Sequence, residues 1–320
     1  ITELEFKSLA SQGYNRIPLM SEAFADLETP LSLYMKLAAG AGGAGGGRYS
    51  FLLESVIGGE RFGRYSFIGL PARTFLRASG FGADARTEVV TDGQVVETAP
   101  GNPLDFVDAY QKRFKVALRP GLPRFCGGLA GYFGYDVVRH IEKKLSASCP
   151  PDTLGTPDIL LMHCEELAVI DNLSGKLYLI VYADPAQPES YSNAKKRLKV
   201  LREQLRYSVA APQVKPSTNY PAERSFAKAD YLAAVERAKE LIAAGDFMQV
   251  QVGQRISKRY TESPLSLYRA VRSLNPSPYM IYYDFGDFHV VSASPEILVR
   301  QEHTAEGKKV TIRPLAGTRP

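Results

Sequence analysis

The feature that most constrains the fold is a series of β-hairpins made by segments that follow one another along the chain. In Thr87–Thr98, two runs rich in β-branched residues are joined by Asp92-Gly93, a pair that favours a type I′ turn because both positions need a positive φ. Glu166–Asp184 and Tyr279–Arg300 repeat the pattern. Because sequential hairpins build antiparallel sheets, the sequence predicts antiparallel β-structure.

Two other segments have the period of a helix. Apolar residues recur at spacings of three and four in 191–205 and again in 231–242. Gly245 follows the second segment, at the place where a glycine commonly ends a helix. Hairpins and helices together predict an α+β fold, with antiparallel sheets forming a sandwich-like core and helices packed outside them.

Composition excludes several classes of protein. The net charge is +5, and the basic run Lys195–Arg197 fits the solvated face of a helix better than a nucleic-acid site. Three cysteines without CxxC spacing and four histidines without ligand spacing predict neither a disulfide framework nor a zinc site. No segment approaches the ~18 apolar residues of a membrane span, and the first residues are unlike a signal peptide. We therefore expect a soluble, cytoplasmic protein that binds neither nucleic acid nor membrane.

The chain also contains a candidate linker. Residues 207–225 are rich in proline, serine and alanine and show no periodicity. This composition predicts one domain over residues 1–206 and a second segment over residues 226–320.

Three stretches carry side chains that could take part in chemistry. Alternation in 246–255 predicts a strand with Gln249 and other polar groups on one face, for a neighbouring strand, water or a ligand to satisfy. Glu296 follows a proline at the predicted start of an apolar strand, as either a structural cap or an acid with a raised pKa. Residues 312–320, IRPLAGTRP, either form a surface turn or supply N–H, hydroxyl and guanidinium groups to a carboxylate ligand.

Read together, five blocks in order resemble the chorismate-utilising enzymes and, within them, component I of anthranilate synthase. Five ordered blocks are far more specific than one motif, and the resemblance covers essentially the whole chain. The blocks are LLESVIGGERFGRYSFIG (52–69), GGLAGYFGYD (127–136), NPSPYM (275–280), SPE (294–296) and IRPLAGTRP (312–320).

The resemblance implies an activity: chorismate and ammonia give anthranilate and pyruvate, the first committed step of tryptophan biosynthesis. Glu296 would be the general acid, and Gly317 and Thr318 would hold chorismate. Mg²⁺ would clamp the substrate carboxylate, and a glutamine amidotransferase subunit would deliver ammonia within a heterotetramer. In this family the Mg²⁺ ligands and a catalytic histidine follow the AGTRP loop. We therefore expect 226–320 to be the first part of a catalytic domain, and this chain to be an N-terminal fragment that is inactive alone.

Two positions bear on the branch of the family. Relatives that make aminodeoxychorismate often carry a lysine, which forms a covalent adduct, where this chain has Ala316. Relatives that make isochorismate or salicylate use a lysine to activate water at the position that matches Gln249. Both substitutions favour anthranilate synthase. The alternatives are an aminodeoxychorismate synthase component I and a module that only binds tryptophan and docks a partner.

The same resemblance implies a feedback site for L-tryptophan. Glu54 and Ser55 would contact the amino-acid group, and Pro278, Tyr279 and Met280 would line the indole side. Taken alone, LLES is a buried strand with a polar end and NPSPYM a proline-containing turn. Because half of the site lies in the predicted regulatory domain (1–206) and half in the catalytic one, tryptophan would act allosterically on their orientation.

Overall fold

The structure is a computed structural model that describes residues 1–40, 47–56, 63–145, 148–210 and 218–314. The chain divides into two compact units. Residues 1–210 and 268–320 make the larger unit, and residues 211–267 make the smaller one.

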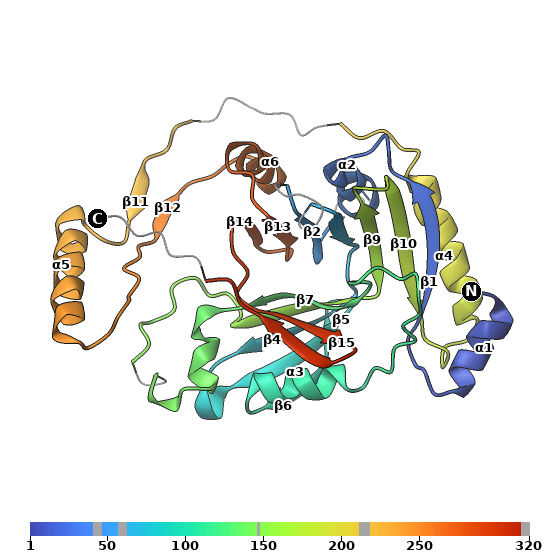
Figure 1. The fold of residues 1–320 in the computed structure, drawn as a ribbon, viewed down its shortest axis with the longest axis horizontal. Coiled ribbons are helices and arrows are strands. Elements are labelled where there is room, and N and C mark those ends of the chain that lie inside the picture. Colours follow the sequence, from blue (N-terminus) through green and yellow to red (C-terminus); the bar gives the residue numbers. More distant parts are fainter. Residues whose placement is uncertain (41–46, 57–62, 146–147, 211–217, 315–320) are drawn as a thin grey trace. The chain divides into compact units, whose positions relative to one another are not determined.

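The larger unit is built on a seven-stranded antiparallel sheet with the order β1-β10-β9-β3-β2-β13-β14 (Figure 1). β2 lies between β3 and β13, so segments far apart in the sequence are hydrogen-bonded neighbours. The strands are β1 (Ile17–Phe24), β2 (Ser50–Glu54), β3 (Tyr65–Gly69), β9 (Glu166–Asp171), β10 (Lys176–Ala183), β13 (Tyr279–Asp284) and β14 (His289–Ser294).

A five-stranded antiparallel sheet, in the order β6-β5-β4-β8-β7, packs on one face of the first. Phe51 and Tyr283 of the first sheet meet Phe75 and Met162 of the second in a buried apolar core. The strands of the second sheet are β4 (Thr74–Ser79), β5 (Arg86–Thr91), β6 (Gln94–Pro100), β7 (Gly128–Phe133) and β8 (Ile159–Cys164), and α3 (Pro103–Gln111) packs against it.

Helices cover the other face of the seven-stranded sheet. The rings of Tyr34 and Tyr268 both contact Tyr282 of β13, and Arg197 bonds to Glu166 of β9. The helices are α2 (Pro30–Tyr34), α4 (Ser190–Gln204) and α6 (Pro264–Leu274), of which the part from Tyr268 belongs to this unit. The unit also holds α1 (Glu3–Ser11) and the hairpin of β15 (Arg300–Thr304) and β16 (Gly307–Thr311).

The smaller unit has far less of a core. It holds α5 (Lys228–Ala244) and two paired three-residue strands, β11 (Ala222–Arg224) and β12 (Ile256–Lys258). No residue of α5, every one of which lies in the described part of the chain, is buried.

The predicted fold class and local elements are confirmed. All three hairpins form, and Asp92 and Gly93 both take the positive φ of the expected turn, 51° and 80°. α4 and α5 occupy the two periodic segments, and Gly245 ends α5 with a φ of 84°.

Two predicted strands are wrong, and both failures have the same cause. Residues 247–255 form no strand before β12, and Met248 is 96% exposed. Residues 295–299, which follow β14, form none either, and Leu298 is 92% exposed. A strand needs a neighbouring strand to pair its N–H and C=O groups in a ladder, and neither segment belongs to a strand pair in the described part of the chain. Glu296 therefore follows a strand instead of starting one.

The compact units have different limits from the predicted domains, 1–206 and 226–320. β13 and β14 lie in the second predicted domain, yet they extend the sheet that starts with β1 because β13 pairs with β2. The domain limits themselves stay a prediction. Among the described helices, none has the length and apolar character needed to cross a bilayer.

Amide hydrogens should exchange more slowly in β13 than in α5, although both elements follow the predicted linker. We expect the amides of Tyr279–Tyr283 to be protected as strongly as those of β9, because β13 is an interior strand of a buried sheet. Amides of α5 should exchange much faster, since a helix without buried residues lacks the packing that stabilises most protein helices. Equal protection of β13 and α5 would contradict this assignment.

Candidate functional site

Glu296 and Arg313 lie in the wall of one hollow of about 440 Å³ at the end of β14. Ser294, the last residue of that strand, fixes the backbone here: its Oγ accepts a hydrogen bond from the Glu296 N–H (3.3 Å) and donates one to the Glu296 carbonyl (2.9 Å). Ile297, Leu298, Ile312 and Pro314 complete the wall. A carboxyl group and a guanidinium group beside apolar side chains form a set that can hold an anionic ring compound and exchange a proton with it.

Gly317 and Thr318 lie outside the described residues. The chain is described as far as Pro314, which is itself in the wall of the hollow. Their predicted role in holding a substrate therefore stays a prediction.

A second candidate site lies where β2 meets β13. Met280 is the register partner of Glu54, and the Val56 N–H donates to the Ser277 carbonyl at 3.2 Å. All five residues predicted to bind tryptophan thus lie at this end of the strand pair, called here the β2–β13 junction: Glu54, Ser55, Pro278, Tyr279 and Met280. Their role as ligand contacts stays a prediction.

The two faces of the sheet separate these residues. Side chains directly opposite in an antiparallel pair share a face, so Glu54 (5% exposed) and Met280 (0%) both lie beneath the helices. Ser55 and Tyr279 follow on the other face by strand alternation, and both are partly exposed, as is Pro278. Ser55, Pro278 and Tyr279 are therefore the partly exposed members of the set, whereas Glu54 and Met280 are buried on the opposite face.

The hydroxyl of Ser55 is unusual. Its Oγ is buried and has no hydrogen-bond partner among the described residues. An unsatisfied buried polar atom costs about 1–3 kcal/mol, so such a group calls for an explanation beyond stability. A ligand with a polar group at this point would supply the missing hydrogen bond.

The carboxylate of Glu54, in contrast, accepts three hydrogen bonds from α6. Arg272 donates from Nε to Oε2 (3.1 Å) and from its terminal nitrogen to Oε1 (3.2 Å), and the Tyr268 hydroxyl donates to Oε2. Burial raises the pKa of Tyr268 above its usual range, and the Glu54 charge raises it further, so this hydroxyl remains a donor. Sequence reasoning missed Tyr268 and Arg272. Their spacing of four on a helix just before NPSPYM was the available signal.

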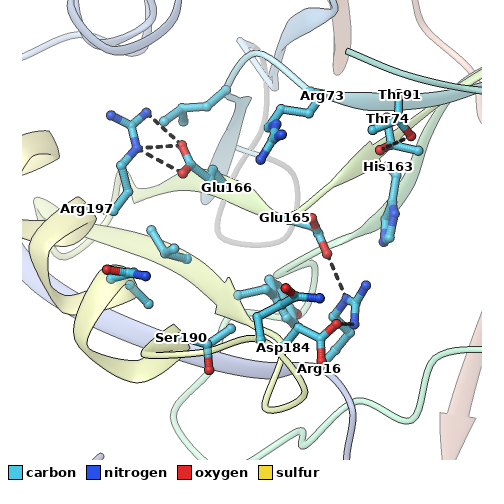
Figure 2. A pocket seen from close by; sticks show the side chains of 18 of the residues that line it. Arg16, Arg73, Thr74, Thr91, His163, Glu165, Glu166, Asp184, Ser190 and Arg197 are labelled. Atoms are coloured by element: carbon cyan, nitrogen blue, oxygen red, sulfur yellow. Dashed lines mark hydrogen bonds and ion pairs between the residues drawn. The ribbon is translucent and has the colours of Figure 1, made fainter. Parts of the chain in front are cut away.

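A hollow of about 830 Å³ lies elsewhere (Figure 2). Its charges are paired with one another: Arg16 with Glu165 (2.8 Å) and Asp184 (3.0 Å), and Arg197 with Glu166 (2.7 Å). Burial lowers the pKa of His163, which favours its neutral form there. Since these charged groups already satisfy one another, we assign this hollow a structural role despite its size.

The chain is similar to proteins of one known family. A family model described as chorismate binding enzyme matches residues 67–320. The whole chain is 53% identical to anthranilate synthase component 1 of Neisseria meningitidis, and 99% of it is 49% identical to the Pseudomonas aeruginosa protein of that name. It spans 62% of the length of each. The crystal structure of anthranilate synthase component I from Streptococcus pneumoniae matches with a TM-score of 0.60 at 28% identity, over 87% of this chain and 58% of that one.

Removing two serine hydroxyls of the β2 segment, one at a time, tests whether Ser55 Oγ lacks a hydrogen-bond partner. Ser55→Ala should leave the free energy of unfolding unchanged or raise it by up to about 1–3 kcal/mol, because no hydrogen bond is lost and an unsatisfied buried hydroxyl is removed. Ser50→Ala is the matched control and should cost about 1–3 kcal/mol, because its hydroxyl bonds to the Tyr34 hydroxyl (2.8 Å) and to the Gly47 carbonyl. Urea unfolding measures both. Equal losses would mean that Ser55 Oγ has a structural partner.

Proposed function

Because the chain belongs to the chorismate-binding enzyme family, we propose that it forms part of an anthranilate synthase component I. In this proposal the protein converts chorismate and ammonia into anthranilate and pyruvate. The relatives of that name at 49–53% identity support the choice within the family. The structural observation that supports it is the hollow at the end of β14, whose wall contains both the Glu296 carboxyl group and the Arg313 guanidinium group.

Each residue of the hollow has a proposed task. Ammonia adds to the chorismate ring as the ring hydroxyl leaves, and Glu296 gives that hydroxyl the proton with which it departs as water. Elimination of pyruvate then leaves the aromatic product. The Arg313 guanidinium suits a substrate carboxylate, and Gly317 and Thr318 would add N–H and hydroxyl donors from the loop that follows.

Mg²⁺ and a partner subunit belong to the proposal as well. Mg²⁺ would neutralise substrate carboxylate charge. No three histidine, cysteine, aspartate or glutamate side chains gather into a metal site in the described part of the chain, and no step is assigned through the ion. A glutamine amidotransferase subunit would supply ammonia, and the cytoplasm is the proposed location.

Ala316 decides against the alternative of an aminodeoxychorismate synthase, since a methyl group cannot form a covalent adduct with the substrate. A chain that binds tryptophan and a partner without doing chemistry is the remaining alternative. Assays for product and for tryptophan binding distinguish the two.

We also propose that L-tryptophan inhibits the protein from the β2–β13 junction. Ser55 Oγ would bond to the amino-acid group of the ligand, and Pro278 and Tyr279 would pack against its indole ring. The junction is adjacent to the catalytic candidate, because Tyr279 is the register partner of Ser294, two residues before Glu296.

Glu296→Gln tests the proposed acid. In the full-length protein, we expect ammonia-dependent anthranilate formation to fall by about 10²–10⁴-fold, the usual contribution of a general acid, while tryptophan affinity stays unchanged. Glu302→Gln is the control, because Glu302, a residue of β15, is paired with Arg124 and does not line the hollow. Near-normal activity of Glu296→Gln would remove Glu296 from the mechanism.

Tryptophan binding can be followed by the fluorescence of the ligand itself, since the chain contains no tryptophan. We expect a saturable change for the wild-type protein. Ser55→Ala should weaken binding about tenfold, the equivalent of one hydrogen bond of about 1.4 kcal/mol. A titration without saturation, or equal affinity in Ser55→Ala, would contradict the proposed contact.

A further inference from the structure

We propose that Glu54, Tyr268 and Arg272 form a clamp that positions the ligand-binding end of β2, and that Glu54 acts through this clamp without contacting the ligand. The inference rests on the proposed tryptophan-binding role of the β2–β13 junction. It changes the part assigned to Glu54 from ligand contact to positioning residue, and it adds two residues of α6 to the site.

The hydrogen bonds of Glu54 leave little room for a ligand. Oε1 accepts from Arg272, and Oε2 accepts from both Arg272 and Tyr268. The residue is only 5% exposed, and Tyr268 is fully buried. The Glu54 side chain is only 2% exposed, so an ammonium group of a ligand could reach the remaining acceptor site on Oε1 only by opening the packing of α6 on the sheet.

The sheet itself separates Glu54 from the ligand. Glu54 points to the face covered by α6, and Ser55, the next residue, follows on the opposite face. The clamp therefore acts through the backbone: by fixing Glu54 it fixes the peptide that carries Ser55.

Tyr268 also ties the clamp to the second strand of the junction. Its ring meets Tyr282 of β13 edge-on, with centroids 5.7 Å apart, while its hydroxyl bonds to Glu54 of β2. One side chain of α6 thus holds both strands in register. Loosening it should move the halves of the proposed site, Ser55 on one strand and Tyr279 on the other, relative to each other.

Tyr268→Phe is the decisive variant, because it removes one donor and keeps the ring. The clamp predicts that L-tryptophan binds this variant about tenfold more weakly. If Glu54 instead held the ligand's ammonium group, freeing one acceptor site of Oε2 would leave affinity unchanged or increase it. Tyr282→Phe is the matched control: its hydroxyl, on the same face, makes no hydrogen bond among the described residues, so its affinity should equal that of the wild type.

Two further readouts separate positioning from general loss of stability. Arg272→Gln should weaken binding, and Arg272→Lys should recover part of the loss, since lysine keeps a charged donor. In Tyr268→Phe, the Val56 amide, which bonds to Ser277 across the junction, should exchange faster, while the Ile281 amide should not.

The possible failures are distinguishable. If the wild-type protein does not bind tryptophan, both the proposed regulatory function and the clamp fall. If the wild type binds and Tyr268→Phe binds equally well, the regulatory function stands and the clamp alone is overturned. Uniformly faster exchange across β2 and β13 in Tyr268→Phe would also overturn the clamp, because it would show that the substitution destabilises the whole sheet.

Discussion

The antiparallel pairing of β2 with β13 is the interaction on which the rest of the structure depends. It attaches β13 and β14 to a sheet otherwise made from the first 183 residues. On one face it brings Phe51 and Tyr283 into the core between the sheets, and on the other it places Glu54 under α6. Without this pairing β13 and β14 would be an isolated hairpin, which is marginally stable in water.

Both candidate sites depend on this pairing, and they lie close together along the register. Tyr279 is the neighbour of Ser55 at the junction and the register partner of Ser294, which fixes the backbone of Glu296. A ligand that binds two arrangements of β13 with different affinity would therefore also change the position of the proposed acid. In this account the paired strands β13 and β14 connect the β2–β13 junction to Glu296.

Local sequence signals predicted the parts of the fold that depend on local physics. Asp92-Gly93 specified its own turn, and the periodic run that became α4 needed only an apolar stripe to pack. The pairing of β2 with β13 carries no such signal, because register between distant segments is decided by which faces become buried together. Residues 247–255 show the converse: their alternation is suitable for a strand, but no described strand lies beside them.

The site was predictable to a similar degree. Resemblance to a family grouped Glu54, Ser55 and Met280 as one site, and strand pairing places them at one junction. The same resemblance could not reveal that Glu54 accepts hydrogen bonds from Tyr268 and Arg272, since that depends on how α6 packs. The hollow around Arg16 is larger than the one beside Glu296, yet Arg16 is paired with Glu165, so volume alone does not identify a binding site.

The pairing at the β2–β13 junction joins β13 and β14 to the rest of the larger unit. In our proposal the same junction is the regulatory site. The sharpest test is hydrogen exchange of the full-length protein with and without L-tryptophan. We expect the ligand to slow exchange of both the Ser55–Val56 amides and the Tyr279–Met280 amides. The protection of the two pairs should rise over the same range of ligand concentration. Protection confined to one strand, or located at another part of the chain, would contradict the proposal.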